Sequence, residues 1–232
     1  MSIFSRAVCT LLFALALVSC GGEKELRSMD GATLVSKENP TMNFQPAEGF
    51  DYVGSFKIVL KERANAERYH WVISDNGRVR KMLIVQIEGL LDGQEGKYSF
   101  SVPPADEQSA GNYKFSPEPI ELGGKAFIHN TWAYNNKASA EADPDLESAS
   151  TLKLLTEKGY RLDDELIMSR FVRAVGDDSR HELILFYYEP LADHLWSLTN
   201  FPEEEGLTVE YDVFSDMIRS RSLESFTVTF ED

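Results

Sequence analysis

Apolar and polar residues alternate in several stretches of the chain, which is the pattern of strands buried on one face. Residues 55–60 carry Phe, Ile and Leu at every second position, and residues 226–230 alternate Phe or Val with Thr. Residues 127–134 are rich in aromatic and apolar side chains. The sequence therefore predicts a strand in each of these three stretches.

Two further pairs of apolar stretches are each separated by a turn sequence. One turn contains Asn76-Gly77, the dipeptide that supplies the positive φ angles of a type I′ turn. The other turn is the Gly-Asp-Asp-Ser sequence of residues 176–179. Each pair is predicted to form a β-hairpin. The four strands of the two hairpins are predicted over 69–73, 79–88, 167–175 and 181–189.

Some of these strands are apolar without alternation, notably at 82–85 and 183–188. Strands of that kind are buried on both faces, so helices should cover the sheet. The clearest helix pattern covers 144–158, with Asp143 as a cap and Gly159 after its end. Apolar residues recur there at every third position.

A second helix is predicted over 211–222, although 207–214 would also serve as a strand. Together these elements predict an α+β fold, a mainly antiparallel β-sheet with one or two helices packed on one face. Residues 50–232 are predicted to form one globular domain, because that length suffices for a single core. Residues 20–49 hold few large apolar side chains and two prolines. They are expected to form a flexible tether.

The charge balance excludes one class of partner. The 232 residues include 23 Lys and Arg against 38 Asp and Glu, a formal net charge of −15. Binding to nucleic acid, or electrostatic binding to an anionic bilayer, requires clusters of Lys and Arg. The sequence contains no such cluster. We therefore expect no nucleic-acid partner.

The first twenty residues have the pattern of an export signal. One positive side chain, Arg6, precedes an apolar run over 7–18 that is shorter than the roughly 20 residues of a transmembrane helix. The run ends in Leu17-Val18-Ser19-Cys20, which resembles the lipobox of bacterial lipoproteins. The resemblance implies that a signal peptide of residues 1–19 is removed and that Cys20 receives diacylglycerol and a further acyl chain.

The lipoprotein resemblance implies a location in the bacterial cell envelope, with the membrane as a partner through the lipid anchor. Gly21 follows Cys20, in place of the Asp that resembles a retention signal for the inner membrane. We therefore expect the outer membrane, with the protein facing the periplasm. Cys9 and Cys20 are the two cysteines of the sequence, so the mature protein would have no free thiol and no disulfide.

A second resemblance covers residues 52–191. The stretch from Arg78 to Gly89 and the stretch from Ser179 to Glu189 are similar to a family of uncharacterised bacterial proteins. Ile87 stands where that family suggests an aromatic residue. The resemblance implies a fold and no activity.

The sequence has no motif that predicts catalysis, a metal site or a cofactor. A G-x-S-x-G turn, an H-E-x-x-H helix, a C-x-x-C pair and phosphate-binding glycine loops are all absent from it. Glu88 and Glu189, each at the end of an apolar strand, are the least ordinary candidates for a pair of catalytic carboxylates. His181 and Glu182 are neighbours on a predicted strand, so they should point to opposite faces.

Aromatic side chains next to histidines are the one indication of a ligand. His70 and Trp71 are neighbours in one predicted strand, and His129 and Trp132 lie in another. Flat aromatic faces beside polar groups suit sugars, peptides or acyl chains. These four residues are therefore the candidate ligand contacts.

The function predicted from the sequence is that of a membrane-anchored, non-catalytic binding or assembly module at the periplasmic face of the envelope. An envelope protein is a candidate partner, since an anchor confines the module near other membrane components. Two alternatives stay open at this point. One is a carrier of a hydrophobic ligand such as an acyl chain, and the other is an envelope hydrolase.

Overall fold

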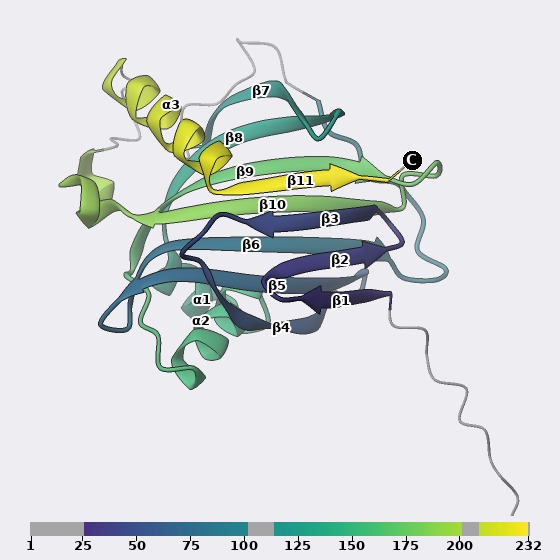
Figure 1. The fold of residues 1–232 in the computed structure, drawn as a ribbon, viewed down its shortest axis with the longest axis horizontal. Coiled ribbons are helices and arrows are strands. Elements are labelled where there is room, and N and C mark those ends of the chain that lie inside the picture. The colour runs from purple at the N-terminus through teal and green to yellow at the C-terminus, as the bar shows by residue number, and fades with distance from the viewer. Residues whose placement is uncertain (1–25, 102–113, 201–208, 232) are drawn as a thin grey trace, which may run out of the picture.

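The largest element of the structure is a seven-stranded antiparallel sheet. The structure is a computed structural model that describes residues 26–101, 114–200 and 209–231. Strand order in the large sheet is β4-β5-β6-β10-β9-β8-β7 (Figure 1). In chain order the strands are β4 (Asp51–Leu60), β5 (Ala64–Asp75), β6 (Arg78–Leu90), β7 (Lys114–Leu122), β8 (Lys125–Asn135), β9 (Glu165–Val175) and β10 (His181–Pro190).

Both predicted hairpins are confirmed, and they lie at the centre of this sheet. Asn76 and Gly77 have φ angles of 49° and 78°, so both occupy the left-handed region that a type I′ turn between β5 and β6 requires. Strands β9 and β10 form the second hairpin, and β10 also pairs with β6. The mainly antiparallel α+β class is therefore confirmed.

A second sheet of four strands lies over one face of the large sheet (Figure 1). Its strand order is β1-β2-β3-β11, all antiparallel. The strands are β1 (Arg27–Asp30), β2 (Thr33–Lys37), β3 (Thr41–Pro46) and β11 (Phe226–Phe230). The predicted strand near the C-terminus is thus confirmed, and its partner comes from the N-terminal region.

The predicted flexible tether over 20–49 is wrong for residues 27–46. Leu34, Met42 and Phe44 are fully buried, because β2 and β3 turn every second side chain toward the large sheet. Three buried side chains suffice here because the strands also gain backbone hydrogen bonds to one another and to β11. The globular domain therefore begins near residue 26, and residues 1–25, with the predicted lipobox, lie outside the described residues.

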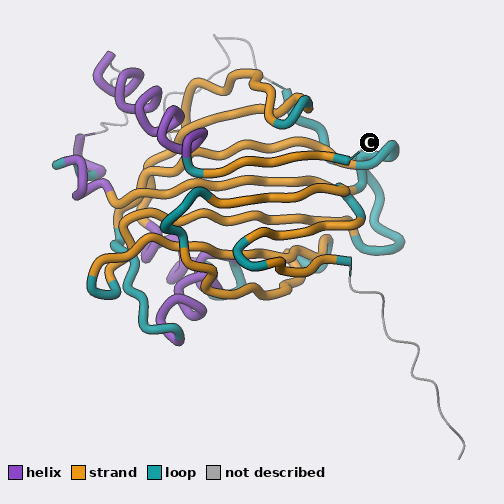
Figure 2. Tube along the Cα trace, in the orientation of Figure 1, coloured by secondary structure: helices purple, strands orange, loops and turns teal. Residues whose placement is uncertain are grey.

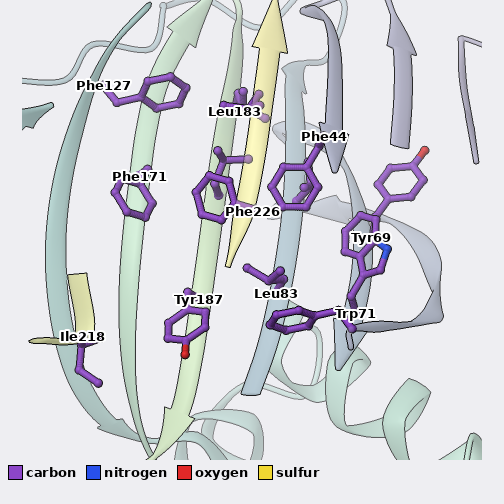
Figure 3. Close-up of a cluster of buried hydrophobic side chains, with 14 of the residues drawn as sticks. Phe44, Tyr69, Trp71, Leu83, Phe127, Phe171, Leu183, Tyr187, Ile218 and Phe226 are labelled. Atoms are coloured by element: carbon purple, nitrogen blue, oxygen red, sulfur yellow. The ribbon is translucent and has the colours of Figure 1, made fainter. Parts of the chain in front are cut away.

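The main core lies between the two sheets. The Phe44 ring is 5.2 Å from the ring of Trp71 and 5.1 Å from that of Phe226, measured between centroids. Phe171 and Leu83 extend this cluster across the large sheet (Figure 3). Aromatic contacts between elements far apart in sequence thus hold the small sheet onto the large one.

Helices lie on both faces of the large sheet. Helix α3 (Val209–Glu224) packs beside the small sheet, with Ile218 in the main core. Helices α1 (Asn136–Ala142) and α2 (Glu147–Glu157) cover the opposite face, where Leu155 joins a second core cluster. The helices form two separate groups in Figure 2. Short 3₁₀ turns, η1 (Leu191–His194) and η2 (Leu198–Asn200), follow β10.

Both predicted helices form. Helix α2 begins later than predicted, and helix α3 packs on the other face of the large sheet. Asp143 does not cap α2. It ends α1, and its side chain accepts a hydrogen bond from the backbone of Asp145, so α2 begins at Glu147 with Leu146 as its N-cap. The expectation of helices on one face holds for α1 and α2. Helix α3 departs from it because its apolar side chains join the core beside the small sheet.

We expect Phe44→Ala to lower the free energy of unfolding by about 3–5 kcal/mol, because it leaves a cavity beside Trp71 and Phe226. Urea denaturation followed by circular dichroism measures the change. Lys37→Ala, an exposed position on the neighbouring strand, is the control and should stay within about 0.5 kcal/mol of the wild type. Equal stability of the two variants would contradict the burial of the small sheet against the core.

Candidate functional site

The face of the large sheet that carries α1 and α2 is hollowed by two adjoining cavities. The first, the outer cleft, has a volume of about 1040 Å³ and lies between β4, the start of α2 and residues 97–100. Charged side chains dominate it, and acidic ones are in excess. They are Glu62, Glu88, Asp143, Asp145, Glu147 and Glu182, with Lys61, Arg63, Lys97 and Arg170.

Two buried glutamates lie opposite each other at the floor of the outer cleft. Glu88 in β6 and Glu182 in β10 are direct cross-strand partners, and each is only 7% exposed. Gln86 donates a hydrogen bond to one oxygen of Glu88, and the Tyr98 hydroxyl donates one to the other over 3.3 Å. Two buried carboxyl groups side by side are not both ionised, because each negative charge raises the pKa of the other group.

The carboxyl pair therefore holds one proton. Burial, together with the hydrogen bond to Glu88 and its charge, raises the pKa of Glu182 from 4.5 to about 9. At neutral pH Glu182 is a carboxylic acid that donates to the Glu88 carboxylate. Every oxygen of Glu88 then has a partner within the protein.

The second cavity, called the inner chamber because it lies beneath α1 and α2, has a volume of about 420 Å³. It adjoins the outer cleft, since both are lined by Glu88, Leu146, Glu147 and Arg170. Nine of the eighteen residues that line it are apolar or aromatic. They are Met82, Ile84, Trp132, Tyr134, Leu146, Met168, Ile184, Phe186 and Tyr188.

Four residues that line the inner chamber each carry a buried polar atom without a hydrogen-bond partner. These atoms are Arg68 Nε, Gln86 Oε1, Asn136 Nδ2 and Ser148 Oγ, which make up half of the eight such atoms among the described residues. Buried polar groups in folded proteins are almost always paired. Their concentration around one cavity makes the chamber a candidate site for bound waters or for a ligand with polar groups.

Arg68 is the most unusual of these residues, because its side chain is charged and only 5% of the residue is exposed. It donates to Thr151 over 3.1 Å and lies 5.4 Å from the Phe186 ring. No carboxylate of the described chain forms an ion pair with it. A buried charge without a counterion is costly, so it marks a site where an anion would be stabilised.

The structure does not bring the four predicted ligand contacts together. Trp132 lines the inner chamber, and His70 lies on the same face, 3.2 Å from Thr151. Trp71 and His129 point to the other face, because neighbouring residues in a strand alternate. Trp71 belongs to the main core and donates to Ala32 over 2.9 Å.

His129 belongs to a chain of a partly exposed carboxylate, a buried histidine and a buried serine under α3. Its Nδ1 is 3.1 Å from Glu118, its Nε2 is 2.7 Å from Ser169, and Ser169 is 3.1 Å from Ser222 of α3. Serine hydrolases use the same order of groups. Ser169, however, is fully buried in mid-strand and lines neither cavity, so a substrate has no space beside it. Burial lowers the pKa of His129 from 6.5 to about 4, and the neutral ring docks α3 onto the sheet.

Glu189, the other predicted strand-end carboxylate, has a similar docking role. It is 3% exposed and accepts hydrogen bonds from Tyr187, from His194 over 2.7 Å and from Arg221 of α3 over 2.9 Å. Burial alone would raise its pKa, but these donors lower it below 4.5. Glu88 and Glu189 lie on opposite faces of the sheet and do not form a pair.

Neither a metal centre nor a membrane span is present in the part of the chain that the structure describes. Within it, no group of three or more His, Cys, Asp or Glu side chains is arranged to hold a metal ion. None of its helices is both long enough and apolar enough to cross a bilayer.

The chain matches no family model, no curated protein and no solved structure in comparisons with known proteins. The resemblance of residues 52–191 to uncharacterised bacterial proteins therefore stays a prediction. The two cavities and the residues that line them are the basis for any functional conclusion.

We expect Glu182 to make the protein less stable as pH rises. The folded state keeps this proton up to about pH 9, whereas the unfolded chain releases it near pH 4.5. Stability should decline across that window by at most about 1.4 kcal/mol per pH unit. Glu182→Gln removes the titrating group, so urea denaturation from pH 5 to pH 8 should show a shallower decline. Glu224→Gln, at an exposed position, is the control, and parallel curves for all three proteins would rule out the shared proton.

Proposed function

We propose that this protein is a lipid-anchored, non-catalytic binding module of the bacterial envelope that holds a small amphiphilic molecule between its large sheet and helices α1 and α2. The observation that carries the proposal is the inner chamber. Half of the residues that line it are apolar or aromatic, and four of the polar ones carry a buried atom that lacks a partner. Most small-molecule sites have this composition, an apolar lining with a few convergent polar groups.

The presence of a charged outer cleft beside a more apolar inner chamber favours a carrier of small molecules over a module that only contacts other proteins. An inner chamber of about 420 Å³ is within the size range of small-molecule pockets. The adjoining outer cleft is charged and open, so it provides a route from the surface to the chamber. A ligand with an apolar part would lose contact with water on moving inward, which is favourable in proportion to the area buried.

The anchor is proposed from the lipobox-like residues that end at Cys20. Strand β1 begins at Arg27, so six residues, 21–26, separate the proposed lipid from the first strand. The seven Cα–Cα steps from Cys20 to Arg27 span at most about 25 Å. The domain would therefore stay close to the membrane surface, with an envelope protein or a membrane-derived small molecule as its partner.

An envelope hydrolase is supported less well. The carboxylates of glycosidases stand about 5–9.5 Å apart with room for substrate between them. Glu88 and Glu182 are hydrogen-bonded to each other instead, and Glu88 is further held by Gln86 and Tyr98. Such a pair is suited to forming one wall of a binding site.

We expect Cys20→Ser to abolish incorporation of radiolabelled palmitate, because the thiol is the proposed site of lipid attachment. The measurement is autoradiography of the protein isolated from labelled bacterial cells. Cys9→Ser is the matched control and should be labelled like the wild type. Undiminished labelling of the Cys20 variant would refute the proposed anchor and leave the proposed cavity untouched.

We expect Ser139→Trp to fill the inner chamber and to reduce binding of the neutral fluorophore N-phenyl-1-naphthylamine at least tenfold. Ser139 lies on α1 and lines the chamber, whereas Ala138 beside it is exposed and does not. Ala138→Trp is therefore the control. Fluorescence titration of the full protein in lipid nanodiscs, with empty nanodiscs as the blank, gives the affinity.

Equal affinity of the two tryptophan variants would contradict ligand binding in the chamber. If Ser139→Trp fails to fold by circular dichroism, Ser148→Trp from the first turn of α2 tests the same space. An absence of fluorophore binding by the wild type would also contradict the proposal.

A further inference from the structure

We infer that the ligand of the inner chamber is an amphiphilic carboxylate, whose anionic group is bound by Arg68 while its apolar part lies against the aromatic wall. This inference rests on the proposed binding function and adds the chemical class of the ligand. It follows from the charge at the chamber, from its hydrogen-bond donors and from its apolar surface.

The charge argument begins with Arg68. The carboxylates nearest to the chamber are already engaged, since Glu88 accepts from Gln86 and Tyr98 and shares the proton of Glu182. Glu147 lies 3.4 Å from the Gln86 amide. Arg68 keeps its Nε–H without an acceptor although it is almost completely buried. An anionic oxygen is the group that this donor needs, because charge-assisted hydrogen bonds to a guanidinium are the strongest that a side chain can form.

The neighbouring polar atoms add donors. Asn136 accepts from Tyr134 through Oδ1 over 3.2 Å, so its amide nitrogen is left to donate. The Ser148 hydroxyl, in the first turn of α2, also has no partner. Three of the four unpartnered groups can therefore donate, and one, Gln86 Oε1, accepts. A ligand rich in acceptors satisfies more of them than an amine does.

Helix α2 contributes to the same preference. Its N-cap, Leu146, lines the chamber and offers no side-chain hydrogen bond to the first turn. The backbone N–H groups at a helix N-terminus carry partial positive charge and favour an anion nearby. This field acts in the same direction as the Arg68 charge, whereas the Glu147 carboxylate in the first turn of α2 opposes both.

The apolar part of the ligand is indicated by the remaining wall. Trp132, Met168 and Phe186 line the chamber, and thioether and aromatic groups adapt to alkyl chains as well as to rings. An inorganic anion would leave this surface without contacts. The chamber therefore fits a molecule with both a carboxylate and an alkyl or aryl body.

Three amphiphiles of equal chain length and different head group test the inference. Full-length protein in nanodiscs is titrated with ¹³C-carboxyl-labelled octanoate and observed by NMR, and octanol and octylamine compete for the site. We expect octanoate to bind most tightly. Arg68→Met should weaken it at least tenfold, because a charged hydrogen bond is lost. Removing an unpaired buried charge should not unfold the protein.

Two control variants separate Arg68 from its charged neighbours. Arg170→Met removes a second guanidinium that lines the chamber, and we expect a smaller loss of octanoate affinity than for Arg68→Met. Glu147→Gln removes a carboxylate that lines the chamber, so octanoate should bind more tightly. If Arg68→Met does not fold, Asn136→Asp places a negative charge at the same site and should also weaken octanoate at least tenfold.

The outcomes distinguish this inference from the proposed function. If octanol or octylamine binds as tightly as octanoate, the inference that the ligand is a carboxylate is refuted. The same holds if the Arg68→Met variant binds octanoate like the wild type. In both cases the cavity still binds an amphiphile, and the proposed function stands. A larger loss for Arg170→Met than for Arg68→Met overturns the assignment to Arg68. If the fluorophore binds and none of the three amphiphiles does, the carboxylate inference fails and the proposed binding function stands. If neither the fluorophore nor any amphiphile binds, both fail.

Discussion

The fold depends on the need to cover the central strands β6 and β10 on both faces. Leu83 and Leu183 point toward the small sheet, whereas Ile84 and Ile184 point toward the helices. Strands with apolar side chains on both faces are stable only between two layers. The small sheet and α3 supply one cover, with closely packed aromatic rings. Helices α1 and α2 supply the other, which is incomplete and leaves the two cavities.

Local patterns were sufficient to predict the elements with strong periodicity or turn chemistry. Asn76-Gly77 fixed one hairpin, and the helix over 144–158 was found to within three residues of its start. The N-terminal strands were missed. Residues 41–45 do alternate polar and apolar side chains, but the alternation is short, and the stability of these strands comes from a distant partner. Residues 41–46 pair with 226–230, across almost the whole chain. A pairing of that separation leaves no signal in a local window.

The candidate site was predictable only in part. Glu88 and Trp132 drew attention from the sequence, but Arg68 and Asn136 did not, since one charged or amide residue in a strand ordinarily faces water. Gln86 carried a usable signal, because it interrupts the otherwise apolar run of β6. These residues come together only because their side chains point to the same face of the large sheet and α2 packs over that face. The site therefore depends on sheet register and helix packing, which local sequence does not reveal.

The position of the cavity relative to the proposed anchor connects binding with the membrane. Arg27, where the folded chain begins, forms an ion pair with Glu67 of β5 over 3.2 Å. Ala64, three residues earlier on that strand, lines the outer cleft. Three residues of a strand span about 10 Å. The described chain thus begins near the end of β5 at which the outer cleft lies, on the opposite face of the large sheet, and an anionic bilayer would repel the excess acidic groups of the cleft. A short anchor together with this repulsion would hold the opening near the membrane without closing it, the arrangement that exchange of an amphiphile requires.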